Sequence, residues 1–153
     1  MSRLVFITGA SSGIGQALAL RFNRAGYRLA LAARRTGELQ SWVDAQAMRS
    51  GSYQIYSADV AVSDSIVAAG KACIASQGVP DVVIANAGIS IGMDTKMRED
   101  LDVMQQTFAT NNIGAAATFH PFIDAMTRRL YCWWQTFAAS HQGLRASRCP
   151  CQC

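Results

Sequence analysis

The sequence predicts an α/β fold, and three observations carry the prediction. Short apolar runs typical of buried strands recur up to residue 85. Segments with the helical spacing of apolar residues separate these runs. The first run also leads through a glycine-rich turn directly into a helix. We therefore expect a doubly wound, Rossmann-like parallel sheet, incomplete on its C-terminal side, with ligands at the carboxyl ends of its strands.

The first strand and its turn occupy residues 4–15, LVFITGASSGIG. The free N–H groups and the dipole of a helix start attract a phosphate at such a junction. Gly9 suits the left-handed backbone of a tight turn, Gly13 has no Cβ to collide with a pyrophosphate, and Gly15 lets the helix lie close to its strand. This spacing matches neither the G-x-G-x-x-G fingerprint nor the phosphate loop. A glycine turn without a ligand is the alternative.

The following helix is expected to bury one apolar stripe and to end at Gly26. That stripe consists of Ile14, Ala17, Leu18, Phe22 and Ala25. The second strand, residues 28–33, is followed by Arg34 and Arg35, with no carboxylate beside them. A dinucleotide fold places an acid here for a ribose 2′-hydroxyl, or a basic residue for a 2′-phosphate. The two arginines therefore favour NADP over NAD, and a solvated arginine pair is the alternative.

Two more strands are expected, each with polar residues after it. Residues 53–57 form the third strand, and Asp59 and Val60 follow it before a helix that begins near Ser63, a plausible N-cap, and ends at Gln77. Asp59 could also be a turn residue that caps this helix. Residues 81–85 form the fourth strand, which leads into Asn86, Ala87 and Gly88. These side chains should gather at one edge of the sheet.

A long helix follows, and its apolar residues recur with three-four spacing. They are Leu101, Met104, Phe108, Ala115, Thr118, Phe122 and Ala125, with Asn111 among them. Asn111 is thus expected on the buried face, where its amide needs hydrogen-bond partners. Pro121 removes one backbone donor, which predicts a bend.

The charge pattern divides the chain into residues 1–127 and a tail, 128–153. The chain has 153 residues and a net charge of +4, yet residues 1–127 hold equal numbers of basic and acidic residues. The tail has four arginines, no acid and four of the five cysteines. The basic surplus therefore concerns the tail and gives no indication that the domain binds nucleic acid, and the cysteine spacing of the CPCQC segment does not match usual zinc sites. No apolar run approaches the ~20 residues that cross a bilayer, so we expect a cytoplasmic protein without a membrane partner.

The T-G-x-x-x-G-x-G spacing of residues 8–15 resembles the cofactor loop of the short-chain dehydrogenase/reductase family, which uses nicotinamide dinucleotides. The resemblance covers about residues 3–127. It implies that the loop binds the cofactor through Gly9, Ser11, Ser12, Gly13, Ile14 and Gly15. It places Asp59 and Val60 at the adenine, and Asn86, Ala87 and Gly88 beside the ribose. Asn111, in preference to Asn112, corresponds to the asparagine of the family's proton relay.

The family's catalytic Ser and Tyr-x-x-x-Lys are not found in this sequence. The only lysines are Lys71 and Lys96, and neither stands four residues after a tyrosine. The resemblance implies an NADP-dependent oxidoreductase that transfers a hydride between nicotinamide and a carbonyl or alcohol carbon, with an incomplete catalytic group. A catalytically inactive dinucleotide-binding module is the alternative. The sequence does not identify the small-molecule substrate.

The tail is expected not to belong to the evolved design of the domain. The charge balance, the acidic residues and the family motifs all stop near Arg128, as a frameshift or truncation of the gene would produce. An evolved tail is the alternative. Without further strands, the long helix should expose Phe119, Phe122 and Ile123, so residues 101–126 offer a surface for homo-oligomers or aggregation.

Overall fold

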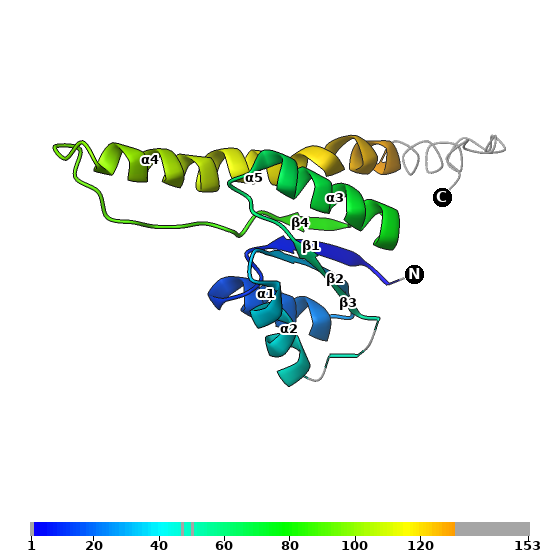
Figure 1. Ribbon diagram of the computed structural model, residues 1–153. Helices are drawn as coiled ribbons and strands as arrows, with labels where there is room; N and C mark the ends of the chain where they lie inside the picture. The colour runs from blue at the N-terminus through cyan, green and yellow to red at the C-terminus, as the bar shows by residue number, and fades with distance from the viewer. Residues whose placement is uncertain (1, 47, 50, 131–153) are drawn as a thin grey trace.

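A computed structural model gives the fold and describes residues 2–46, 48–49 and 51–130. Its four strands form one parallel sheet in the order β3-β2-β1-β4. The strands are β1 (Leu4–Thr8), β2 (Arg28–Ala33), β3 (Tyr53–Ser57) and β4 (Val82–Ile84). Figure 1 shows helices on both faces of this sheet. The predicted fold class, a doubly wound parallel sheet, is therefore confirmed.

The register of the strands brings their carboxyl ends together. Thr8 pairs with Ala32, and Ala33 pairs with Ser57. The residues that follow each strand consequently meet at one edge of the sheet, as predicted. The fourth strand is one residue shorter at each end than the predicted 81–85. After its C-terminal end, the Asn86 backbone N–H donates to the Thr8 hydroxyl, 3.1 Å away.

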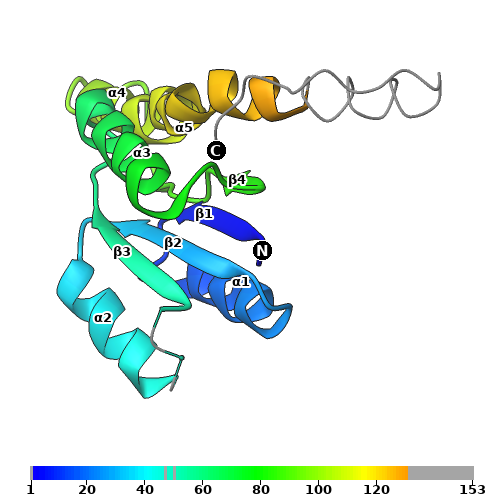
Figure 2. The same cartoon turned by 90° about the vertical axis from the view of Figure 1, so that its right-hand side faces the viewer.

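Alternating side chains of the strands build a core on each face. On one face, Leu4 and Phe6 pack with residues of α3 (Ser63–Gln77) and with Phe122. On the other face, Val5 and Ile7 pack against α1 (Gly13–Arg24) and α2 (Thr36–Ala45). Strands buried on both faces are typical of parallel sheets and explain their continuous apolar runs. The view in Figure 2 shows α1 and α2 on one side and α3 on the other.

Residues 100–130 form one helical rod (Figure 1). It consists of α4 (Asp100–Phe108), a π-helical turn (Ala109–Ile113), α5 (Gly114–Phe119), a 3₁₀ turn (His120–Phe122) and a helical segment, 123–130. The 3₁₀ turn contains Pro121, so the predicted irregularity lies where the proline removes a backbone donor. The α4 end of the rod extends beyond the sheet.

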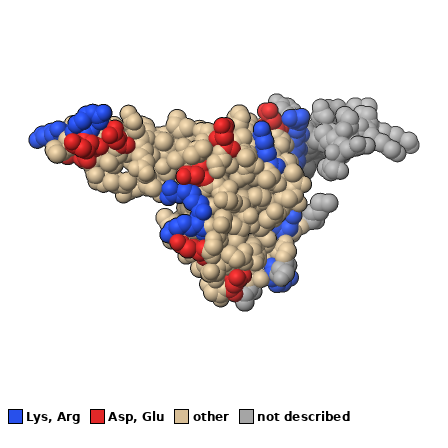
Figure 3. Space-filling view, viewed as in Figure 1, with Lys and Arg blue, Asp and Glu red and all other residues tan. Residues whose placement is uncertain are grey.

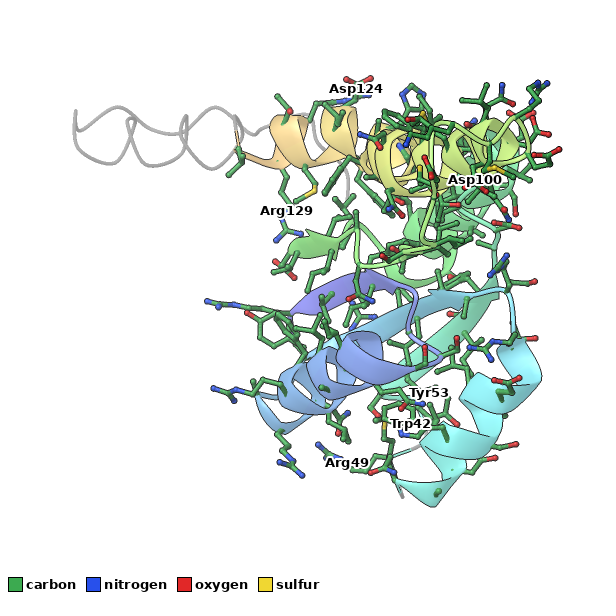
Figure 4. The ribbon with its side chains drawn as sticks, turned by 90° about the vertical axis from the view of Figure 1, so that its left-hand side faces the viewer. Trp42, Arg49, Tyr53, Asp100, Asp124 and Arg129 are labelled. Atoms are coloured by element: carbon green, nitrogen blue, oxygen red, sulfur yellow. The ribbon has the colours of Figure 1, made fainter. Side chains whose placement is uncertain are left out.

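The other end of the rod is fixed to the sheet by packing and by charge. The Phe122 ring lies 4.9 Å from the Phe6 ring, centroid to centroid. The Arg129 guanidinium donates to the Val79 carbonyl oxygen at 3.0 Å and pairs with the Asp81 carboxylate. Figure 4 shows Arg129 pointing from the rod toward β4. These contacts hold the C-terminal part of the described rod over the α3 face of the sheet.

Two local predictions about the first and third helices are wrong in part. Leu18 and Phe22 of the predicted α1 stripe pack against the core as expected, whereas Ile14 is 73% exposed and Ala17 and Ala25 are exposed too. The fully buried residues of α1 are Gly15 and Ala19, and neither belongs to the predicted stripe. Helix α3 has Val62 at its N-cap position, so Ser63 is already the first helical residue.

The predicted stripe of the long helix is wrong in its first half. Leu101, Phe108 and Asn111 are exposed, whereas Thr118 and Phe122 are buried. There are two physical reasons for the difference. Helix α4 extends beyond the sheet, so no core lies beneath it. The π turn also changes the helical period, so residues before and after it that a regular period places on one face point in different directions. Phe119 and Ile123 are exposed as expected, but Phe122 is not, because it packs on Phe6.

Charged side chains gather at the outer end of α4, as Figure 3 shows. They include Lys96, Arg98, Glu99, Asp100 and Asp102.

Among the residues that the structure describes, no helix is both long and apolar enough to span a membrane.

Candidate functional site

The glycine turn has the geometry that its sequence predicts. Gly9 and Gly13 have φ angles of +65° and +52°, in the left-handed region that side chains rarely adopt. A Cβ at Gly15 would overlap the Gly9 carbonyl oxygen and lie 2.9 Å from the Asn86 Nδ2 atom. A Cβ at Gly13 would meet nothing within 4 Å. Gly9 and Gly15 therefore permit the tight turn, while Gly13 leaves its outer side open.

Thr8 locks the glycine turn to the Asn86 turn. Its hydroxyl oxygen accepts hydrogen bonds from the backbone N–H groups of Asn86 and Ala87, each at 3.1 Å. The Asn86 side-chain amide donates to the Thr8 and Gly9 carbonyl oxygens at 3.0 and 3.3 Å. Thr8 is 1% exposed, so water cannot easily replace these bonds. Thr8 belongs to the predicted motif, but its role was not predicted, because only the pairing of β1 with β4 shows its partners.

Asn111 holds the loop that follows β4. Its side-chain oxygen accepts from the Ile89 N–H at 2.9 Å, and its amide donates to the Ile89 carbonyl oxygen at 2.8 Å. Asn111 lies in the π-helical turn, which directs its side chain toward this loop although the residue is exposed. The Asn111 amide therefore has the hydrogen-bond partners that were predicted, but they are backbone groups of a loop and not groups in the core. Asn112 is exposed as well, and both side-chain bonds to Ile89 come from Asn111.

The α5 start packs closely against the segment after β3. A Cβ at Gly114 would lie 2.7 Å from the Val60 carbonyl oxygen. The Asp59 carboxylate accepts from the Ala61 N–H at 3.0 Å and does not cap α3, which begins at Ser63, four residues after Asp59. Asp59 therefore lies at the carboxyl ends of the strands, beside the residue that follows β2.

Both arginines after β2 have an acidic neighbour. Arg34 Nη1 lies 3.7 Å from Asp59 Oδ2, and Arg35 Nη1 lies 2.9 Å from Glu38 Oε2. The expectation that Arg34 has no carboxylate nearby is therefore wrong, because a residue distant in the sequence supplies one. The reason is the parallel pairing of β2 with β3, which places Asp59, 25 positions later in the chain, beside Arg34.

These turns together line a cleft of about 420 Å³ at the carboxyl edge of the sheet. The predicted residues that line it are Gly9, Ser11, Ser12, Gly13, Ile14, Arg34, Arg35, Asp59, Val60, Asn86, Ala87 and Gly88. Gly15 and Asn111 lie behind this lining and support it. Five residues that were not predicted also line the cleft: Ala32, Ala33, Ala58, Ile89 and Thr110. Figure 3 shows basic and acidic side chains gathered on this side of the molecule, below the projecting helix.

The comparisons identify the family to which this arrangement belongs. A profile of the family described as short chain dehydrogenase matches residues 3–131. The chain belongs to this family. The match covers the whole described rod, including Arg129, and so extends a few residues beyond the predicted limit of the resemblance. Members of the short-chain dehydrogenase family are oxidoreductases that use nicotinamide cofactors.

Individual relatives agree with the family match. The chain is 34% identical over 127 residues to an uncharacterized oxidoreductase of Myxococcus xanthus, covering 83% of this chain and 50% of that protein. It is 30% identical over 129 residues to the NADPH-dependent pterin aldehyde reductase of Arabidopsis thaliana, covering 84% and 52%. The chain thus spans about half the length of the curated relatives it matches.

A solved structure agrees as well. The alcohol dehydrogenase of the archaeon Thermococcus sibiricus, complexed with 5-hydroxy-NADP, has a TM-score of 0.73 and 29% sequence identity to this chain. The alignment covers 84% of this chain and 55% of that one.

Tyr56 has a shifted pKa and lies outside the cleft. It belongs to β3 and packs against α3, and burial raises its pKa to about 12. Its hydroxyl bonds to Ser76 and Gln77, at 2.8 and 3.0 Å. Burial also raises the pKa of the neighbouring Cys73 thiol to about 11. A proton-relay tyrosine needs a lowered pKa, so both the position of Tyr56 and the direction of its shift are unsuited to that chemistry.

No cluster of metal-ligating side chains occurs in the part of the chain that the structure describes. The CPCQC segment and the rest of the predicted tail beyond residue 130 lie outside the described residues.

Proposed function

We propose that the cleft binds NADP(H) and that the chain is the cofactor-binding part of an NADP-dependent oxidoreductase. The observation that carries this proposal is the convergence of an open glycine turn and two arginines in one cleft. Backbone N–H groups at the start of α1 suit a pyrophosphate, and guanidinium groups suit a further phosphate. Two relatives support the choice of cofactor: one is named NADPH-dependent and another is complexed with 5-hydroxy-NADP.

The residues of the cleft fit such a cofactor in their size and in their chemistry. Gly13 leaves space where a side chain would otherwise block the approach to the backbone. Arg34 and Arg35 line the side of the cleft next to β2, where a 2′-phosphate is expected. We assign Asp59 and Val60 to the adenine and Asn86–Gly88 to the ribose. The lining residues at positions 32, 33, 58 and 87 are alanines, whose small side chains leave room in the cleft.

The reaction of the family is hydride transfer between nicotinamide and a carbonyl or alcohol carbon. Of the family's catalytic group, we assign only Asn111 to this chain. Its two bonds to Ile89 would hold the loop after β4, which borders the cleft. Because the printed sequence has no Tyr-x-x-x-Lys, we propose that it binds the cofactor but transfers hydride poorly by itself.

Cofactor choice is tested by titrating NADPH and NADH into the full chain and measuring each Kd by calorimetry. NADPH should bind more tightly, and Arg34→Asp should reduce or reverse the order. Loss of a charge-assisted pair costs about 1.5–3 kcal/mol, roughly one to two decades in affinity. Arg49→Asp is the matched control, because Arg49 lies at the other end of the sheet and outside the cleft. Equal affinities for the two cofactors would refute the assignment.

Catalysis is tested by NADPH oxidation with a panel of aldehydes and ketones. Turnover comparable to that of complete dehydrogenases would contradict the proposed deficiency. Binding without turnover is the result that the proposal expects, and it also fits the alternative, an inactive dinucleotide-binding module.

The boundary between residues 1–127 and 128–153 stays a proposal, and it is tested by translating the gene in its other two frames around codons 126–131. A Tyr-x-x-x-Lys in a neighbouring frame would support the frameshift, and its absence from both would favour an evolved tail.

A further inference from the structure

The ion pair between Arg34 and Asp59 joins the ends of two neighbouring strands in the lining of the cleft. The two residues follow β2 and β3, which are neighbours in the sheet, and both line the cleft. The Nη1–Oδ2 separation of 3.7 Å exceeds hydrogen-bond distance. The contact is therefore a charge attraction that consumes none of the guanidinium's N–H donors, which remain available to a phosphate.

The Asp59 partner of this pair is held more firmly than the Arg34 partner. Its Oδ1 atom accepts from the Ala61 N–H at 3.0 Å, and its backbone N–H donates to the Ser65 hydroxyl at 3.1 Å. The Arg34 side chain is 65% exposed, against 35% for Asp59. The carboxylate is thus a fixed negative charge in the cleft, and the guanidinium is the member of the pair that can move toward a ligand.

We infer that Asp59 is a specificity-determining residue that weakens the preference for a 2′-phosphate, an inference that rests on the proposed function. Two effects have the same sign. The carboxylate attracts Arg34 and so competes with the phosphate for it, and the negative charge of the carboxylate repels the phosphate itself. Any contact of Asp59 with the adenine is common to NADPH and NADH, so it cancels in the ratio of their affinities.

The test compares the ratio of NADPH to NADH affinity in four full-chain proteins: wild type, Asp59→Asn, Arg34→Ala and the double variant. The side-chain amide in Asp59→Asn would keep an oxygen for the Ala61 N–H, so the fold is retained, and thermal unfolding checks this. Asp44→Asn is the control, since it changes the net charge equally but lies on α2 and bonds to Gln40. Each affinity is measured by calorimetry at low and at high salt.

Asp59→Asn should raise the affinity ratio about two- to fivefold at low salt, which corresponds to about 0.4–1 kcal/mol, as for an exposed ion pair. The gain should shrink in high salt and in the Arg34→Ala background. Asp44→Asn should leave the ratio unchanged. An unchanged or lower ratio in Asp59→Asn would overturn the inference while leaving the proposed cofactor in place. Failure of the wild type to bind either cofactor would overturn both.

Discussion

A methyl group added at two different glycines should have opposite effects on stability. At Gly15 the new Cβ would overlap the Gly9 carbonyl oxygen and lie 2.9 Å from Ala10 Cα and from Asn86 Nδ2. Ordinary van der Waals contact begins at 3.4 Å. Two of these three neighbours are backbone atoms of the turn, so they cannot rotate away. Helix α1 would have to move from the turn, and the Thr8–Asn86 lock would loosen with it.

The cost follows from the cost of overpacking a core. An extra methylene in a packed site typically costs about 1–3 kcal/mol, and the backbone contacts place Gly15→Ala at the upper end, about 3 kcal/mol. At roughly 2–4 °C per kcal/mol for a chain of this size, Tm should fall by about 6–12 °C. The site should lose cofactor affinity too, because the start of α1 borders the cleft.

Gly37→Ala is the matched control, because it adds the same methyl group on α2 with nothing within 4 Å. Alanine replaces glycine in a helix with a gain of about 0.5–1 kcal/mol, so Tm should rise by a few degrees. Circular dichroism at 222 nm during heating measures both variants, and urea unfolding replaces it if heating is irreversible. Equal stability of Gly15→Ala and wild type would show that the turn yields, and the packing argument would then be wrong.

Other contacts give three further predictions. Burial alone would raise the pKa of Asp81, but the hydrogen bond from the Leu4 N–H and the charge of Arg129 outweigh burial and lower this pKa below its ordinary value. The ionised Asp81 carboxylate therefore stabilises the fold above about pH 4, and this stabilisation is lost in stronger acid. Asp81→Asn should therefore be about 1–2 kcal/mol less stable at pH 7, with the difference shrinking toward pH 2, in urea unfolding. Arg129→Ala should show the same trend, and no effect would support a domain boundary before Arg129. Cys73, with its pKa raised to about 11 by burial, should resist iodoacetamide at pH 8 until urea is added, as peptide mass spectrometry can show. Asn111→Ala should speed proteolysis of the loop after β4, whereas Asn112→Ala should not, and equal rates would contradict the role given to Asn111.

Much of the fold was predictable because it depends on local patterns. The strands β1, β2 and β3 were predicted nearly to the residue. For β1 and β2 the reason is that a strand buried on both faces is almost continuously apolar, whereas the edge strand β3 is marked by its tyrosines and isoleucine. The glycine spacing predicted the turn, since only glycine adopts the φ angles found at Gly9 and Gly13 without strain. The edge at which the site residues gather followed from the parallel topology alone.

The contacts between distant segments could not be read from the sequence. The acid beside Arg34 comes from a strand that is a neighbour only in the folded sheet, so a search of the adjacent sequence missed it. The apolar pattern found Leu18 and Phe22 on the packed side of α1 but not the fully buried Gly15, because a glycine does not stand out by hydrophobicity. The face of the long helix changes at a π turn, which no regular period predicts.

The sequence by itself therefore determined the fold class, the turn at the helix start and the residue types along the cleft, because backbone sterics and hydrophobic period act between near neighbours. Tertiary structure alone decided which partner each of these residues has. Thr8 became the link between two turns, Asn111 became the support of a loop, and Asp59 became the counter-charge of Arg34. Strand order and helix packing set such distances, because they bring together residues that are far apart in the sequence.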